Sequence, residues 1–271
     1  MAATARPGDS PKYIVVALDI ETTGMQCLPH AETGHRDAMF SVGAAIYDAA
    51  ASDPQKCLIE QHLFNLNLQK PADVEWGAFW DQNGWERRCY DEFWSKNVPM
   101  LEKTQDKSAV GTWKGINGVP RTVSLLSTPD GVADAVNDLL RHVEERWPAY
   151  VLVTDTMDYD FRWLSNALEA HGHAPLGYTR SGAYRWWARD IHKGSYLVGR
   201  AGRSYLDNMA VDVKPAVAAV TATFSIGTQH THCADDDAAD IGAQVVAAIR
   251  YGLGAPPAPK RLCVASSTAQ Q

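Results

Sequence analysis

Residues 13–24 read YIVVALDIETTG, a short apolar run that ends in two acidic residues. The run from Tyr13 to Ile20 is rich in β-branched residues, which is typical of a strand buried on both faces. Asp19 and Glu21 stand two positions apart, so both carboxylates project to the same side of that strand. Two like charges this close repel each other unless a cation lies between them. The alternative interpretation is a solvated strand end, which needs no cation.

The chain has 271 residues, of which 45% are hydrophobic and 21% are charged. This composition can form a substantial core and argues against wholesale disorder. The length favours one large α/β domain, or such a core with an insertion, over two ordinary domains. The net charge of −7 argues against a protein that coats phosphate backbones by bulk charge.

The cysteines indicate a reducing compartment. There are five, with no CxxC pair, which suits neither a zinc site nor a disulfide framework. No apolar run approaches the roughly 20 residues of a membrane helix, and the first residues lack the apolar core of a signal peptide. The sequence therefore predicts an intracellular protein, with cytoplasm and nucleus not separable.

The periodicity of the remaining sequence predicts a mixed sheet flanked by helices. Further strands are expected at 39–47, 64–68, 150–154 and 185–191, which gives five with the first. Helices are expected from Thr128 to Trp147, around 160–168 and over 234–251. The predicted fold is α/β, with one domain over 12–254 between flexible tails at 1–11 and 255–271.

Residues 69–127 fit this pattern poorly and are interpreted as an insertion into the domain. They hold five of the nine tryptophans. The stretch around Arg87 and Arg88 mixes aromatic and basic residues, a composition used for base stacking and phosphate contact. Packing onto the core is the favoured interpretation. Contact with a nucleic-acid strand, or a partner or self-association surface, are the alternatives.

Two more acids point toward the core from predicted helices. Asp160 shares a face with Trp163, Leu164 and Leu168, and Asp237 shares one with Ile241 and Val245. Either acid alone could be a first-turn helix cap. Apolar elements that deliver four carboxylates inward instead favour a site for Mg²⁺ or Mn²⁺, which prefer oxygen ligands. His232 precedes the last helix and could reach the same place.

The motifs that contain these residues resemble those of the DEDDh 3′–5′ exonucleases. That family includes polymerase proofreading subunits, oligoribonucleases and three-prime repair exonucleases. The resemblance rests on DIETTG at 19–24, YDFRWL at 159–164 and HCADDDA at 232–238, and it covers roughly 12–68 and 128–252. Members often have His-Asn before the second motif, where this chain has Thr154-Asp155-Thr156. Two rival assignments are Asp158 for the second motif, and His230 with Asp235 for the third.

The resemblance implies a ribonuclease H-like fold and a function. The implied reaction is phosphodiester hydrolysis at single-stranded or frayed 3′ ends of DNA or RNA, which releases nucleoside 5′-monophosphates. Two Mg²⁺ or Mn²⁺ ions would be held by Asp19, Glu21, Asp160 and Asp237, with His232 as general base. The terminal nucleotide would be held by Thr22, Thr23 and Gly24, with Met25 against its base. An oligoribonuclease-like enzyme for short RNA, or a non-catalytic nucleic-acid-binding scaffold, are the alternative functions.

Overall fold

The computed structural model describes residues 14–25, 37–51, 56–115, 118–147, 150–154, 157–176, 186–188 and 232–253. The two expected tails, Asp155, Thr156 and His230 lie outside these ranges, as does most of the strand expected at 185–191. The side chain of Asp158 is likewise outside the described part.

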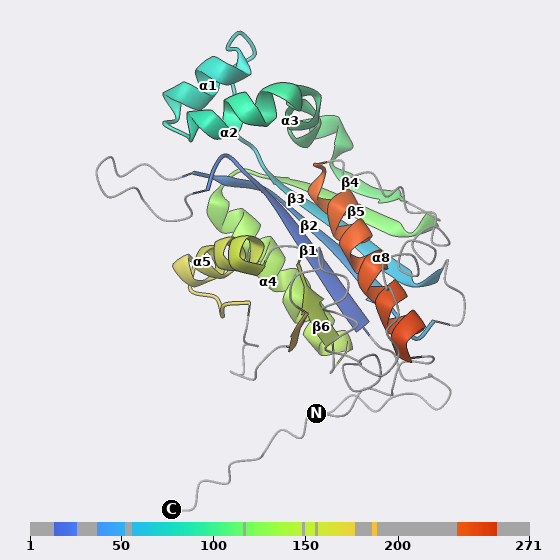
Figure 1. Cartoon of the computed structure of the whole chain (residues 1–271). Helices are drawn as coiled ribbons and strands as arrows, with labels where there is room; N and C mark the ends of the chain where they lie inside the picture. The colour runs from blue at the N-terminus through green and yellow to red at the C-terminus, as the bar shows by residue number, and fades with distance from the viewer. Residues whose placement is uncertain are drawn as a thin grey trace, which may run out of the picture.

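The described strands form one seven-stranded sheet in the order β4-β5-β3-β2-β1-β6-β7 (Figure 1). β1 pairs antiparallel with β2, β2 with β3, and β4 with β5, whereas the β1–β6, β6–β7 and β3–β5 pairs are parallel. The strands are β1 (Ile14–Thr22), β2 (Met39–Asp48), β3 (Leu58–Leu66), β4 (Gly111–Lys114), β5 (Pro120–Leu126), β6 (Tyr150–Val153) and β7 (Trp186–Ala188).

A mixed α/β sheet flanked by helices is confirmed, and the ribonuclease H-like fold stays what the resemblance implies. The expected count of five strands was wrong, because β4 and β5 lie within residues 69–127 and extend the sheet beyond β3. β4 has four largely exposed residues and no apolar run, so its sequence carries no strand pattern. The predicted domain limits stay a prediction.

The two faces of β1 divide the core. Its residues Ile14, Val16 and Leu18 belong to one apolar cluster with α4 (Pro129–Arg146) and α5 (Arg162–Ala170). Val15 and Ala17 belong to another, which is formed largely with α8 (Ala234–Leu253). Helices α4 and α5 therefore cover one face of the sheet, and α8 covers the other (Figure 1).

The predicted helices are confirmed. Thr128 caps α4 by accepting a hydrogen bond from the Gly131 amide at 3.1 Å, as its position before Pro129 indicated. In the part of the chain that the structure describes, no helix combines the length and apolar character that crossing a membrane requires.

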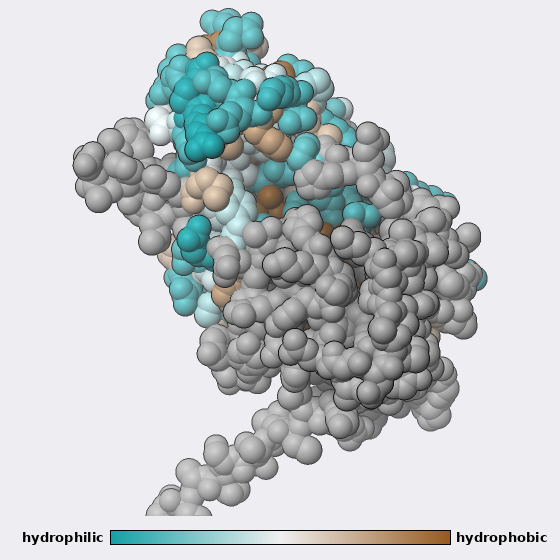
Figure 2. Space-filling view, in the orientation of Figure 1, coloured by the Kyte–Doolittle hydropathy of each residue, from teal (hydrophilic) through white to brown (hydrophobic). Residues whose placement is uncertain are grey.

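Three short helices stand beyond the end of β1 (Figure 1). They are α1 (Trp76–Gln82), α2 (Arg87–Glu92) and α3 (Val98–Thr104), with the 3₁₀ turn η2 (Trp94–Lys96) between α2 and α3. Trp76, Trp80 and Trp94 are buried in the main core, which confirms packing as the role of these three side chains. On the face shown in Figure 2, the surface of this segment is mostly hydrophilic.

The arginines of this segment are paired within the chain. Arg87 binds Asp81 at 2.8 Å and Asp91 at 2.9 Å, and Arg88 binds Glu92 at 3.0 Å. Exposed pairs of this kind contribute little stability, but they balance the local charge. Both arginines of α2 are therefore opposed by acids, while contact of this segment with a nucleic-acid strand or a protein partner stays a prediction.

Helix α8 lies unusually close to the sheet. A Cβ atom added at Gly43 of β2 would stand 2.0 Å from the backbone of Ala234, and one added at Gly242 would stand 2.3 Å from the Tyr47 ring. The Tyr47 hydroxyl donates to the Ala239 carbonyl at 2.6 Å. The first turns of α8 are thus pressed directly onto β2 and β1.

Replacement of Gly43 by Ala should destabilise the protein, because the new methyl group meets backbone that cannot move aside. Overpacked cores lose about 1–3 kcal/mol, and this site should reach at least that range. The free energy of unfolding in urea measures the effect. Gly131→Ala is the matched control, since its Cβ would meet only ordinary contacts at 3.5 Å and should be neutral or slightly stabilising. Equal stability of Gly43→Ala and the wild type would contradict the close contact.

Candidate metal centre

Asp19 and Glu21 continue the face of β1 that packs against α8. They follow Val15 and Ala17 at intervals of two residues, and only 5% and 8% of their surfaces are exposed. Asp19 pairs in register with Gly43, where the backbone of Ala234 makes its closest approach to the sheet. The predicted pair of carboxylates is therefore buried beside the first turn of α8.

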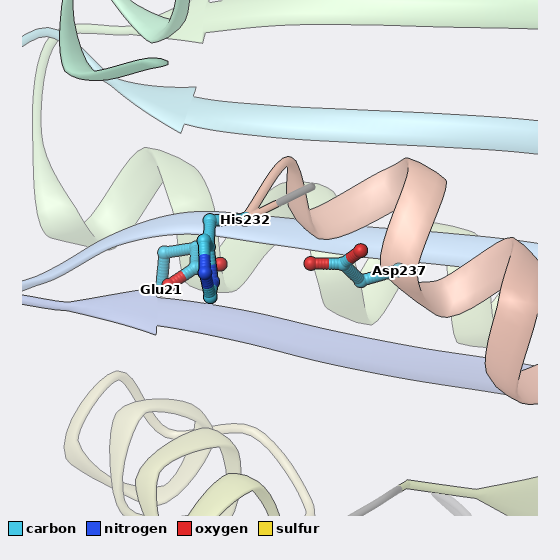
Figure 3. Close-up of side chains that lie close together, drawn as sticks. All are labelled: Glu21, His232 and Asp237. Atoms are coloured by element: carbon cyan, nitrogen blue, oxygen red, sulfur yellow. The ribbon is translucent and has the colours of Figure 1, made fainter. Parts of the chain in front are cut away.

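Glu21, His232 and Asp237 form a cluster whose candidate ligand atoms all lie within 4.8 Å of one another. Figure 3 shows Glu21 at the end of β1, the His232 ring beside it, and the Asp237 carboxylate directed toward both from α8. Glu21 and Asp237 are buried, and His232 is partly buried. The structure thus brings together three of the predicted residues from two distant parts of the chain.

Asp160 is also buried, with 2% of its surface exposed. It lies in the π-helical turn η5 (Met157–Phe161), between β6 and α5. The expected first turn of an α-helix is therefore replaced by a wider turn, in which the acid still faces inward. Because β6 runs parallel to β1 and η5 contacts β1, Asp160 lies on the flank of β1 that faces β6.

Tyr159 was part of the second motif, but its contacts could not be read from the sequence. Its hydroxyl donates to the Gly24 carbonyl at 3.0 Å and contacts the Thr22 hydroxyl. Burial raises the pKa of the Tyr159 phenol above its ordinary value, and the Asp160 and Glu21 carboxylates add to the rise. Tyr159 therefore stays protonated and ties η5 to the end of β1.

The residues after β1 form a closely bonded turn. The Thr22 hydroxyl donates to the Gly24 carbonyl at 2.8 Å, and the Thr23 hydroxyl accepts from the Ala38 amide at 2.7 Å. Both hydroxyls thus hold the turn itself, while Met25 is 59% exposed. The assignment of Thr22, Thr23, Gly24 and Met25 to the terminal nucleotide stays a prediction.

The segment of α1 to α3 contributes directly to this turn and to His232. The indole N–H of Trp94 donates to the Thr22 carbonyl at 2.9 Å, and the Glu86 carboxylate accepts from the Met25 amide at 2.9 Å. The ring of Phe93 meets the ring of His232 edge to face, with centroids 4.4 Å apart. Sequence reasoning missed these contacts, because nothing local in 69–127 indicates where that segment docks.

Of the rival acids in the third motif, Asp235 is engaged elsewhere. Its carboxylate accepts two hydrogen bonds from the Arg121 guanidinium, at 2.6 and 2.8 Å. Asp235 and Asp237 are two positions apart on a helix, so their side chains leave it about 200° apart. The geometry therefore favours Asp237, the acid that meets Glu21 and His232.

The donor set suits a divalent metal ion. The cluster offers the carboxylates of Glu21 and Asp237, and Asp19 and Asp160 are two further buried carboxylates that are not among its three residues. Hard cations such as Mg²⁺ and Mn²⁺ prefer oxygen ligands. Buried like charges of this number also require a counter-charge, which such ions supply. The residues present therefore fit a metal centre.

The chain matches no protein-family model and no curated protein. Among solved structures, it is similar to the crystal structure of cell-death related nuclease 4 (CRN-4), with 13% sequence identity and a TM-score of 0.46. The match covers 89% of this chain and 65% of that chain, so the chain spans less than two thirds of that structure's length. A similarity this weak carries no argument about chemistry, which has to come from the cluster itself.

Asp237→Asn should weaken Mn²⁺ binding, because an amide oxygen carries no charge. Loss of a group that only supports a ligand typically costs roughly 10–100-fold in metal affinity, so loss of a ligand charge should cost at least as much. Titration of the purified protein with Mn²⁺, followed by electron paramagnetic resonance, measures the dissociation constant. Asp138→Asn, an exposed acid on α4 paired with Arg141, is the control and should bind as the wild type does. Unaltered affinity in Asp237→Asn would remove this residue from the centre.

Proposed function

We propose that the chain is a metal-dependent 3′–5′ exonuclease that hydrolyses phosphodiester bonds of DNA or RNA. The observation that supports this most is the meeting of Glu21, His232 and Asp237 within 4.8 Å. An imidazole beside buried carboxylates couples a proton acceptor to a metal-binding site, which is what hydrolysis by an activated water needs. A binding scaffold has no use for that combination.

Each residue of the proposed site has a role that follows from its place. Asp19, Glu21, Asp160 and Asp237 would hold two divalent ions, Mg²⁺ or Mn²⁺. When bound, such ions activate a water molecule and stabilise charge on the leaving oxygen. His232 accepts the proton of the attacking water, since imidazole exchanges protons near neutral pH. The Phe93 ring, nearly perpendicular to the imidazole with centroids 4.4 Å apart, limits how far the imidazole can turn.

The turn after β1 is the proposed seat of the terminal nucleotide. Its backbone is fixed by Thr22, Thr23 and Tyr159, and its exposed Met25 is available to contact a base. A site built this way engages one chain end rather than a long stretch of backbone. That agrees with a net charge of −7 and with paired arginines on α2. The proposed substrates are single-stranded or frayed 3′ ends.

One parallel incubation tests the function. The purified chain with Mg²⁺ or Mn²⁺ is mixed with 5′-end-labelled single-stranded DNA, duplex DNA, long RNA and RNA of two to five nucleotides. We expect ladders that shorten from the 3′ end, with nucleoside 5′-monophosphates as products, and no reaction in EDTA. Degradation of the short RNA alone would indicate an oligoribonuclease-like enzyme. Binding without any degradation would favour the scaffold function and overturn the proposal.

His232→Ala should lower kcat while leaving metal binding largely intact, because it removes the proton acceptor and keeps all four carboxylates. General-base groups contribute typically about 10²–10⁴-fold to the rate. Steady-state rates on the best of the four substrates measure the loss. His142→Ala is the matched control: this histidine is half exposed on α4, 3.7 Å from Glu60 and outside the site. Full activity in His232→Ala would show that another group takes the proton.

A further inference from the structure

A buried ion pair joins the start of α8 to strand β5. The Nε and Nη2 atoms of Arg121 bind the Oδ2 and Oδ1 atoms of Asp235 at 2.6 and 2.8 Å, which is the two-pronged geometry that arginine forms with a carboxylate. The Asp235 side chain is wholly buried, and that of Arg121 is 23% exposed. This contact holds the first turn of α8 from the side opposite to Asp237.

The acids around Arg121 do not form a second metal site. Cys233, Asp235 and Asp236 lie close enough to hold an ion, but the guanidinium is already there, with Nη2 3.7 Å from the Cys233 sulfur and 3.9 Å from Asp236. Burial raises the pKa of the Cys233 thiol above its ordinary value, which disfavours the thiolate that a metal would need. The positive charge at this place is Arg121.

The backbone at His232, three residues before the ion-paired Asp235, is in an unusual conformation. His232 has a φ angle of +56°, a left-handed value that a residue with a side chain adopts rarely and keeps only where its surroundings impose it. The carbonyl oxygen of the next residue, Cys233, accepts hydrogen bonds from the Asp236 and Asp237 amides at 2.9 Å each. These two bonds begin helix α8. A shift of the first turn would therefore move His232 and Asp237 together.

We propose that Arg121 is a positioning residue for the metal centre: by gripping Asp235, it fixes the first turn of α8 and the left-handed His232, so that His232 and Asp237 meet Glu21. The inference rests on the proposed function only through the metal centre. Arg121 touches none of the three clustered residues in the contacts described here. It acts on them through the helix start.

The decisive variant is Arg121→Lys, which keeps the charge and loses the two-pronged grip. We expect the Mn²⁺ dissociation constant to rise roughly tenfold, the lower end of the usual cost of a supporting group. We also expect kcat to fall and KM for the nucleic acid to stay near its wild-type value. Arg146→Lys is the matched control, because Arg146 binds Glu60 through a single contact at 2.8 Å that lysine can reproduce. Wild-type Mn²⁺ affinity in folded Arg121→Lys would overturn the inference.

A second variant guards against a folding defect. Arg121→Met combined with Asp235→Leu removes both charges at once, so no charge is left buried alone and the fold should persist. We expect weaker Mn²⁺ binding than in the wild type, because apolar side chains do not fix the direction of the helix start. A double variant that folds and binds Mn²⁺ as tightly as the wild type would likewise overturn the inference.

Amide hydrogen exchange separates this inference from the proposed function. The Asp236 and Asp237 amides bond to Cys233, so their exchange reports the order of the first turn without any metal. Suppose that the wild type degrades no nucleic acid, and that the Asp236 and Asp237 amides exchange faster in Arg121→Lys than in Arg146→Lys. The inference would then stand and the proposed function would be rejected. Unchanged exchange and affinity in a chain that does degrade nucleic acid would reject the inference alone.

Discussion

The close approach of α8 to β2 at Gly43 determines how near Asp237 of α8 comes to the acids at the end of β1. A side chain at this position would lift the helix, because its first atom would fall 2.0 Å from the Ala234 backbone. With the helix seated, Asp237 lies level with the end of β1, where Asp19 and Glu21 emerge from the same face. Ala17, Ala238 and Ala239 add small side chains to the same interface.

The same packing creates an electrostatic cost. Four carboxylates, those of Asp19, Glu21, Asp160 and Asp237, are each at most 8% exposed. Burial of like charges is unfavourable unless an opposite charge lies among them. Divalent ions would supply that charge, so their binding would favour the folded state over the unfolded chain in the manner of any ligand specific to the native form. Under the proposed function, the apolar strand and helix form the frame that would hold both the acids and these ions.

A structural feature could be predicted from the sequence where its cause lies within a few neighbouring residues. The burial of β1, the cap at Thr128 and the inward side of α8 follow from spacing over a few residues, and all were predictable. The partners of those elements were not. Arg121 and Asp235 are 114 positions apart, and His232 and Phe93 are joined only after α8 and η2 have docked. Strand β4 was not predicted for a related reason. Its pairing with β5, rather than its own composition, makes it a strand.

These distant contacts change the meaning of residues 69–127. Treated as an insertion, they stood apart from the chemistry, yet Trp94 holds the carbonyl of Thr22, Phe93 borders His232, and Arg121 grips the start of α8. Trp76, Trp80 and Trp94 are used for packing and the α2 arginines pair with neighbouring acids, whereas Trp113 is 52% exposed. Under the proposed function its contribution is geometric. It fixes both ends of the site, the turn after β1 and the first turn of α8, and thereby sets the space that one chain end can occupy.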